Sequence, residues 1–61
     1  MKAVIKINMD NAAFDPEPSI ELGRILREVA DEVDPWPIKP GSRMILRDIN
    51  GNTVGELKVS K

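Results

Sequence analysis

In residues 2–9 every second position is apolar and the positions between them are mostly polar, which is the pattern of a β-strand that buries one face. Between residues 22 and 33 the period changes, because apolar side chains return every three or four positions, as on one side of an amphipathic α-helix. The expected inward face of the strand carries Ala3, Ile5, Ile7 and Met9, and the apolar stripe of the helix carries Leu22, Ile25, Leu26, Val29, Ala30 and Val33.

The sequence defines the end of this helix more sharply than its start. Asp15 before Pro16 and, alternatively, Ser19 are both suited to cap its first turn, so we place the start between residues 16 and 20. The helix must end by Asp34, because residues 34–41 hold three prolines and are expected to be extended.

Residues 43–48 and 53–59 read as two further strands joined by a turn at Asn50-Gly51. Asn-Gly is a strong hairpin signal because both residues tolerate a positive φ. Phe14, in the loop after the first strand, is expected to anchor in the core. The side chains expected to face the helix are those of Met44, Leu46, Leu57 and Val59.

The element order is therefore β-α-β-β, and we expect residues 1–61 to form a single α+β domain of two layers, in which one amphipathic helix packs on a three-stranded, mainly antiparallel sheet. We favour the last strand in the middle, antiparallel to both neighbours. In the alternative order the first strand lies beside the second in parallel, after a right-handed crossover.

The composition argues against an enzyme. His, Cys and Tyr are absent, which removes the commonest general base, the thiolate nucleophile, disulfides and cysteine-ligated metals. Asp48, Asn50 and Asn52 alternate as at the start of a calcium loop, but Gly51 is misplaced and the twelfth position lacks a glutamate. We therefore interpret these residues as a hairpin turn and expect no catalytic residue, metal or cofactor.

Charge is distributed unevenly along the chain. Residues 10–34 hold eight acids and two bases, a net charge of −6, whereas the remaining residues hold seven bases and two acids, a net charge of +5. In the expected fold the helical layer is acidic and the sheet layer is basic. Such a division can be simply a solvated exterior, or it can indicate that one layer is a docking surface.

Two surfaces and one side chain are candidates for binding. Trp36 either covers the core between its two prolines or anchors an interface. An apolar strip formed by Val4, Ile45 and Val54 on the outer sheet face suits self-association. The candidate sheet face holds Val4, Lys6, Ile45, Arg47, Val54 and Lys58, and the candidate helix face holds Glu21, Arg24, Glu28, Asp31 and Glu32.

Four stretches carry a resemblance to known proteins: Asn11-Ala12-Ala13-Phe14, the segment ELGRILR at 21–27, Leu46-Arg47-Asp48, and the segment NGNTVG at 50–55. With them the chain resembles a group of short proteins encoded in bacteriophages and prophages. The resemblance implies a bacterial host cytoplasm as the setting, but it transfers no activity and no residue role.

Together these observations favour a non-enzymatic interaction protein of phage or prophage origin that binds and modulates a host bacterial protein. One alternative is a nucleic-acid-binding module that uses the basic sheet face. Another is an acidic nucleic-acid mimic that inhibits a host defence complex of the anti-CRISPR or anti-restriction type. We expect a cytoplasmic protein without a membrane span, and a homodimer would supply burial that 61 residues provide only marginally.

Overall fold

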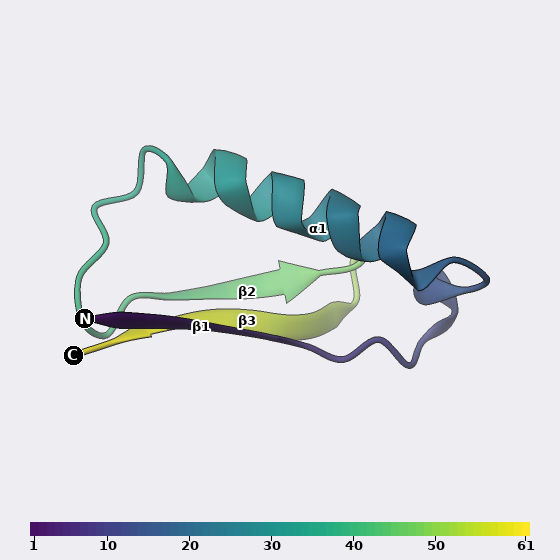
Figure 1. Ribbon diagram of the computed structural model, residues 1–61, viewed down its shortest axis with the longest axis horizontal. Coiled ribbons are helices and arrows are strands. Elements are labelled where there is room, and N and C mark those ends of the chain that lie inside the picture. Colours follow the sequence, from purple (N-terminus) through teal and green to yellow (C-terminus); the bar gives the residue numbers. More distant parts are fainter.

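β1 (Lys2–Ile7) and β3 (Thr53–Ser60) lie side by side, and β2 (Arg43–Arg47) occupies the other edge of β3. In the computed structural model, which describes all 61 residues, the short 3₁₀ turn η1 (Ala12–Phe14) and the helix α1 (Pro18–Val33) complete the chain (Figure 1). Both strand pairings are antiparallel, in the order β1-β3-β2. The predicted α+β class and the favoured strand order are confirmed, and the parallel alternative is wrong.

The core lies between α1 and the sheet. Leu57 is the central position of the sheet, because it pairs with Ile5 on one side and with Met44 on the other. Phe14 from the η1 turn is 1% exposed, so it is the loop anchor that the sequence predicted. The seven buried apolar side chains are those of Phe14, Ile25, Val29, Leu46, Val54, Leu57 and Val59.

The start of α1 corrects both predicted caps. Glu17 occupies the N-cap position with non-helical backbone angles, makes no side-chain capping bond, and is followed by Pro18 at the first helical position. The physical reason is that a residue before proline avoids the helical region, whereas proline itself suits the first turn. Asp15 therefore precedes the helix, with a cis bond to Pro16, and Ser19 lies inside the first turn.

The buried stripe of α1 is rotated from the predicted one. Ile25 and Val29 are buried, but Leu26 is 41% exposed. Glu21, one turn before Ile25, is buried although its charge placed it on the predicted outer face. A stripe at positions 21, 25 and 29 follows the i, i+4 spacing of a helix, so Glu21 shares the inward side with two core residues. α1 contains no segment that is long and apolar enough to cross a membrane.

The predicted hairpin forms, but its turn differs from the expected one. The N–H of Gly51 donates to the carbonyl of Asp48 at 3.0 Å, and Gly51 has a φ of +86°. No residue other than glycine has a positive φ, so Asn50 does not adopt the conformation that an Asn-Gly pair was expected to share. A single positive-φ glycine closing a longer loop is the usual alternative to a two-residue hairpin.

A β-bulge follows this turn and changes the direction of one side chain. Leu46 pairs with Gly55 but Arg47 pairs with Thr53, which leaves Val54 as an extra residue in β3. Val54 is 7% exposed and belongs to the core. The prediction that Val54 lies on the outer sheet face is therefore wrong, because a bulge interrupts strict alternation.

The backbone of β1 lies very close to Gly55 of β3. A Cβ atom added to this glycine would lie 1.9 Å from the carbonyl oxygen of Lys6, a distance that no side chain can tolerate. Gly55 is thus the residue that lets the two backbones meet at the end of β1.

We predict that Gly55→Ala destabilises the fold by about 1–3 kcal/mol, because β1 must move away from β3. Gly23→Ala is the matched control: its Cβ would contact only the mobile end of Arg27 at 3.4 Å, and alanine favours a helix by up to about 1 kcal/mol. Urea denaturation of both variants checks the prediction, and an equal effect of the two substitutions would contradict it.

Candidate functional site

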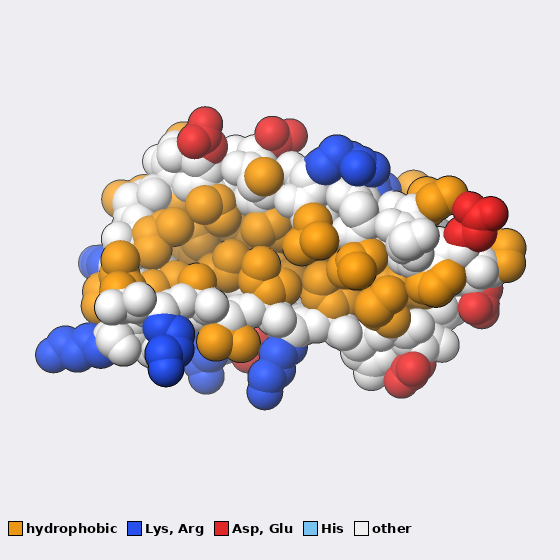
Figure 2. Space-filling view, in the orientation of Figure 1, with side chains coloured by type: hydrophobic (Ala, Val, Ile, Leu, Met, Phe, Trp, Pro, Cys, Tyr) orange, Lys and Arg blue, Asp and Glu red, His pale blue; other side chains and the backbone are white.

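The outer face of the sheet, opposite α1, is strongly basic. Strand register places Val4, Lys58 and Arg43 in one row and Lys6, Glu56 and Ile45 in the next. Blue side chains project along this side of the molecule in Figure 2. The basic sheet face, as we name it, carries five cations and one acid: Lys2, Lys6, Arg43, Arg47, Lys58 and Glu56.

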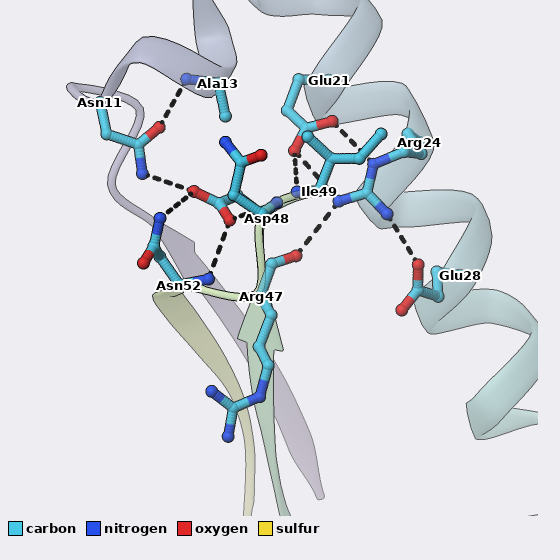
Figure 3. Close-up of polar contacts among 10 residues, drawn as sticks. Asn11, Ala13, Glu21, Arg24, Glu28, Arg47, Asp48, Ile49 and Asn52 are labelled. Carbon is cyan, nitrogen blue, oxygen red and sulfur yellow. Dashed lines mark hydrogen bonds and ion pairs between the residues drawn. The ribbon is translucent and has the colours of Figure 1, made fainter.

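Most of these cations have no acidic partner. Arg43 is the exception, because its Nε donates to Oε2 of Glu56. Arg47 points away from the helix (Figure 3), and its Nη1 donates to the hydroxyl of Thr53 at 3.0 Å. Lys2, Lys6 and Lys58 form no ion pair. The face therefore has a net charge of +4, and its positive electrostatic potential attracts an anionic partner.

The apolar residues of this face do not form the predicted strip. Val4 is 44% exposed and Ile45 is 41% exposed, so both side chains are accessible. However, β3 separates their strands, and Val4 pairs with Lys58 whereas Ile45 pairs with Glu56, so two strand spacings and one row place them about 12 Å apart. A shallow hollow on the face is bordered by Val4, Lys6, Glu56 and Lys58. The basic sheet face is thus cationic with isolated apolar positions.

Asp48 organises the turn at the end of β2 (Figure 3). Its carboxylate accepts from the side chain of Asn11 at 2.8 Å and from the backbone N–H groups of Asn50 and Asn52 at 2.9 Å each. Asn52 adds its side-chain amide at 3.2 Å. These oxygens face N–H donors, which satisfies them without a cation. The spacing that resembled a calcium loop therefore serves to join the η1 loop to the hairpin.

Glu21 joins α1 to the same hairpin. Its carboxylate accepts from Nε of Arg24 at 2.7 Å and from the backbone N–H of Ile49 at 2.8 Å. Arg24 in turn donates to Glu28 at 2.8 Å and to the carbonyl of Arg47 at 3.3 Å. Glu21 and Arg24, two of the five residues assigned to the helix face, therefore link α1 to the hairpin and are not part of a free surface.

Both carboxyl groups are held in the ionised form. The hydrogen bond from Arg24 lowers the pKa of Glu21 below its ordinary value, against the opposing effect of burial. The same contact raises the pKa of Arg24. Burial by itself would raise the pKa of Asp48, but the hydrogen bonds from Asn52, Asn11 and Asn50 outweigh it and lower that pKa. The fold thus depends on two ionised, buried carboxylates.

The other candidate residues are distributed as follows. Asp31 and Glu32 are exposed on α1, as is Glu28, which is already bonded to Arg24. Trp36 is half-buried and packs against the core cluster, which agrees with the core-cover interpretation. The structure therefore brings together Lys6, Arg47 and Lys58 on one face, whereas the helix face retains only three accessible carboxylates.

Sequence reasoning missed the hydrogen bonds that Asn11 and Glu21 make with the hairpin. These contacts join segments that are far apart in the sequence, and the structure brings those segments together at the hairpin. Sequence reasoning also left Lys2 and Arg43 out of the candidate sheet face, although the two-residue period of the strands assigns them to the face that holds Lys6 and Arg47.

Comparison of the chain with protein-family models, with curated proteins and with solved structures finds no match. A functional assignment for this fold therefore depends on its surfaces and on the chemistry of their side chains.

We predict that Glu21→Gln lowers stability at pH 7 and flattens the loss of stability on acidification. A carboxyl group with a lowered pKa in the folded state stabilises the fold above its unfolded pKa, near 4.5, and this contribution disappears as the pH falls through the folded value. The wild-type protein should therefore lose stability below about pH 4.5, and the variant should lose less over the same range.

Urea midpoints measured between pH 7 and pH 2.5 test this expectation. Asp31→Asn is the control, since it removes an exposed carboxylate from the same helix. If the control and Glu21→Gln changed the pH profile equally, the Glu21 contacts would not be the source of the acid sensitivity.

Proposed function

We propose that the protein is a small non-enzymatic binding protein whose basic sheet face docks on an acidic surface of a host bacterial protein. The observation that carries the proposal is the clustering of five cations on one sheet face, with four of them lacking an acidic partner in the chain. Unpaired charges of one sign accelerate encounter with a surface of the opposite sign and select against basic partners.

The composition of this face favours a protein over a nucleic acid. Bases are held by stacking on exposed aromatic side chains, but Phe14 is buried and Trp36 packs on the core, on the other side of the sheet. Glu56 lies in the middle strand of the face and would repel phosphates. The exposed side chains of Val4 and Ile45 suit a protein surface that mixes apolar and acidic groups.

Two further considerations support the rest of the proposal. A non-enzymatic role agrees with the absence of His, Cys and Tyr, and with the use of both buried carboxylates as structural hydrogen-bond acceptors. A bacterial host partner is what the resemblance to short phage and prophage proteins implies.

Nucleic-acid binding is the second candidate, because the unpaired cations of the sheet face would also attract a phosphate backbone. The acidic mimic has less support. A mimic needs an extended array of free carboxylates, but Glu21 is buried and Arg24 neutralises part of the charge of Glu28.

We predict that the double variant Lys6→Glu and Lys58→Glu loses the partner, with a decrease in captured protein of at least about tenfold, because two attractive charges become repulsive. The control Arg27→Glu with Lys39→Glu changes the net charge equally at exposed positions in α1 and the proline-rich loop. Quantitative affinity capture from bacterial lysate with isotope-labelled samples compares the two, and the retained partner should dissociate as salt increases.

A direct measurement separates the two candidates. Random-sequence DNA and RNA oligonucleotides are titrated with the protein in fluorescence anisotropy at about 50 mM salt, where phosphate contacts are strongest. If the oligonucleotides bind the wild-type protein and the control but not the Lys6 and Lys58 variant, the partner of the basic sheet face is a nucleic acid and not a protein. Capture that is the same for the charge-reversed variant and the control, with no oligonucleotide binding, would overturn the role of the basic sheet face.

A further inference from the structure

The side of the sheet that faces α1 is only partly covered. Ala3 and Ile5 of β1 pair with Val59 and Leu57 of β3, so they lie on the helix side of the sheet. Val59 and Leu57 are buried, but Ile5 is 43% exposed and Ala3 is exposed as well. α1 therefore covers the centre of the sheet and leaves the inner side of β1 open.

A continuous apolar surface fills this space between α1 and β1 (Figure 2). A depression in it is lined by side chains of both elements, including Ala3 and Val33, and by Ile38 from the proline-rich loop. Leu26 lies two turns before Val33 on the same side of α1 and is 41% exposed. We name this surface the α1–β1 furrow, and its residues are Ala3, Ile5, Ile7, Leu26, Val33 and Ile38.

The total exposed area shows that the chain alone buries less surface than a compact protein of its size. Its accessible surface is 4440 Å², whereas a compact monomer of 6.8 kDa is expected to expose about 3950 Å². The difference is about 500 Å², on a protein with seven buried apolar side chains and no disulfide. An interface of standard size buries about 800 Å² on each partner, which exceeds this difference, so one such interface would be enough to remove it.

We propose that a second copy of this chain covers the α1–β1 furrow and that the protein is a two-fold symmetric homodimer. The residues of the furrow are apolar, so it presents no charge that would require a partner of a particular sign. A furrow exposed in the free chain promotes aggregation, and a second copy is present wherever the chain is made. Each copy contributes the same furrow, as a two-fold interface requires.

The charges of β1 favour contact through the furrow over contact between strand edges. If the β1 edges of two copies paired antiparallel in the register centred on Val4, Lys2 of one copy would face Lys6 of the other, and these charges repel. Contact through the furrow instead leaves both basic sheet faces directed outward. With the two-fold axis along the furrow, α1 of each copy lies over β1 of the other, so that Leu26 meets Ile5 across the interface.

We predict that sedimentation equilibrium of the wild-type chain gives twice the mass of 6.8 kDa, with dissociation on dilution. Ile5→Lys and Leu26→Lys each place a charge in the interface and should weaken dimerisation about a hundredfold. Ile20→Lys is the control, because Ile20 is 64% exposed and lies about 120° around the axis of α1 from Leu26, outside the furrow.

Two outcomes overturn the proposal. One is a wild-type chain that stays monomeric up to about 500 μM, well above the Kd of a standard interface. The other is a dimer that both lysine variants retain with a native circular-dichroism spectrum. If a lysine variant fails to fold, isotope-filtered NMR of a mixed wild-type sample decides: contacts between the methyl groups of Ile5 and Leu26 of different copies support the furrow dimer, and their absence overturns it.

Discussion

Two buried carboxylates hold the separate parts of this small fold in place. Glu21 joins the first turn of α1 to the backbone of the hairpin, and Asp48 joins the hairpin to the η1 loop. With seven buried apolar residues and no disulfide, the protein has a small core and no covalent link between these segments. The position of β2 beneath α1, and therefore the separation of a basic outer face from an apolar inner one, depends on this network.

Much of the fold follows from periodicity, and the exceptions have local physical causes. The strand and helix periods located all four main elements, and the Asn50-Gly51 pair located the hairpin. Val54 escaped prediction because a bulge is set by pairing between β2 and β3, which alternation along one strand does not contain. Glu21 escaped because a hydrophobic pattern assigns every carboxylate to water, although its neighbours Arg24 and Ile49 supply the donors that make burial tolerable.

The two candidate surfaces also differ in how far the sequence predicts them. Lys6, Arg47 and Lys58 share a face because side chains alternate along a strand, a rule that the sequence alone supports. The α1–β1 furrow depends instead on the sideways placement of α1 over the sheet. An apolar stripe predicts that a helix packs on a sheet, but it does not indicate which two of three strands the helix covers. Leu26 and Ile5 therefore read as core residues in the sequence and are accessible in the structure.

The order β1-β3-β2 also has a consequence for how the chain folds. The middle strand is the last of the three along the chain, and the two outer strands make no backbone pairing with each other. Neither β1 nor β2 can join a sheet before residues 53–60 are available, and β1 must then pair across nearly the whole sequence. Such distant pairing slows folding relative to local contacts. During synthesis, the apolar residues of β1 thus remain without a strand partner until β3 has left the ribosome.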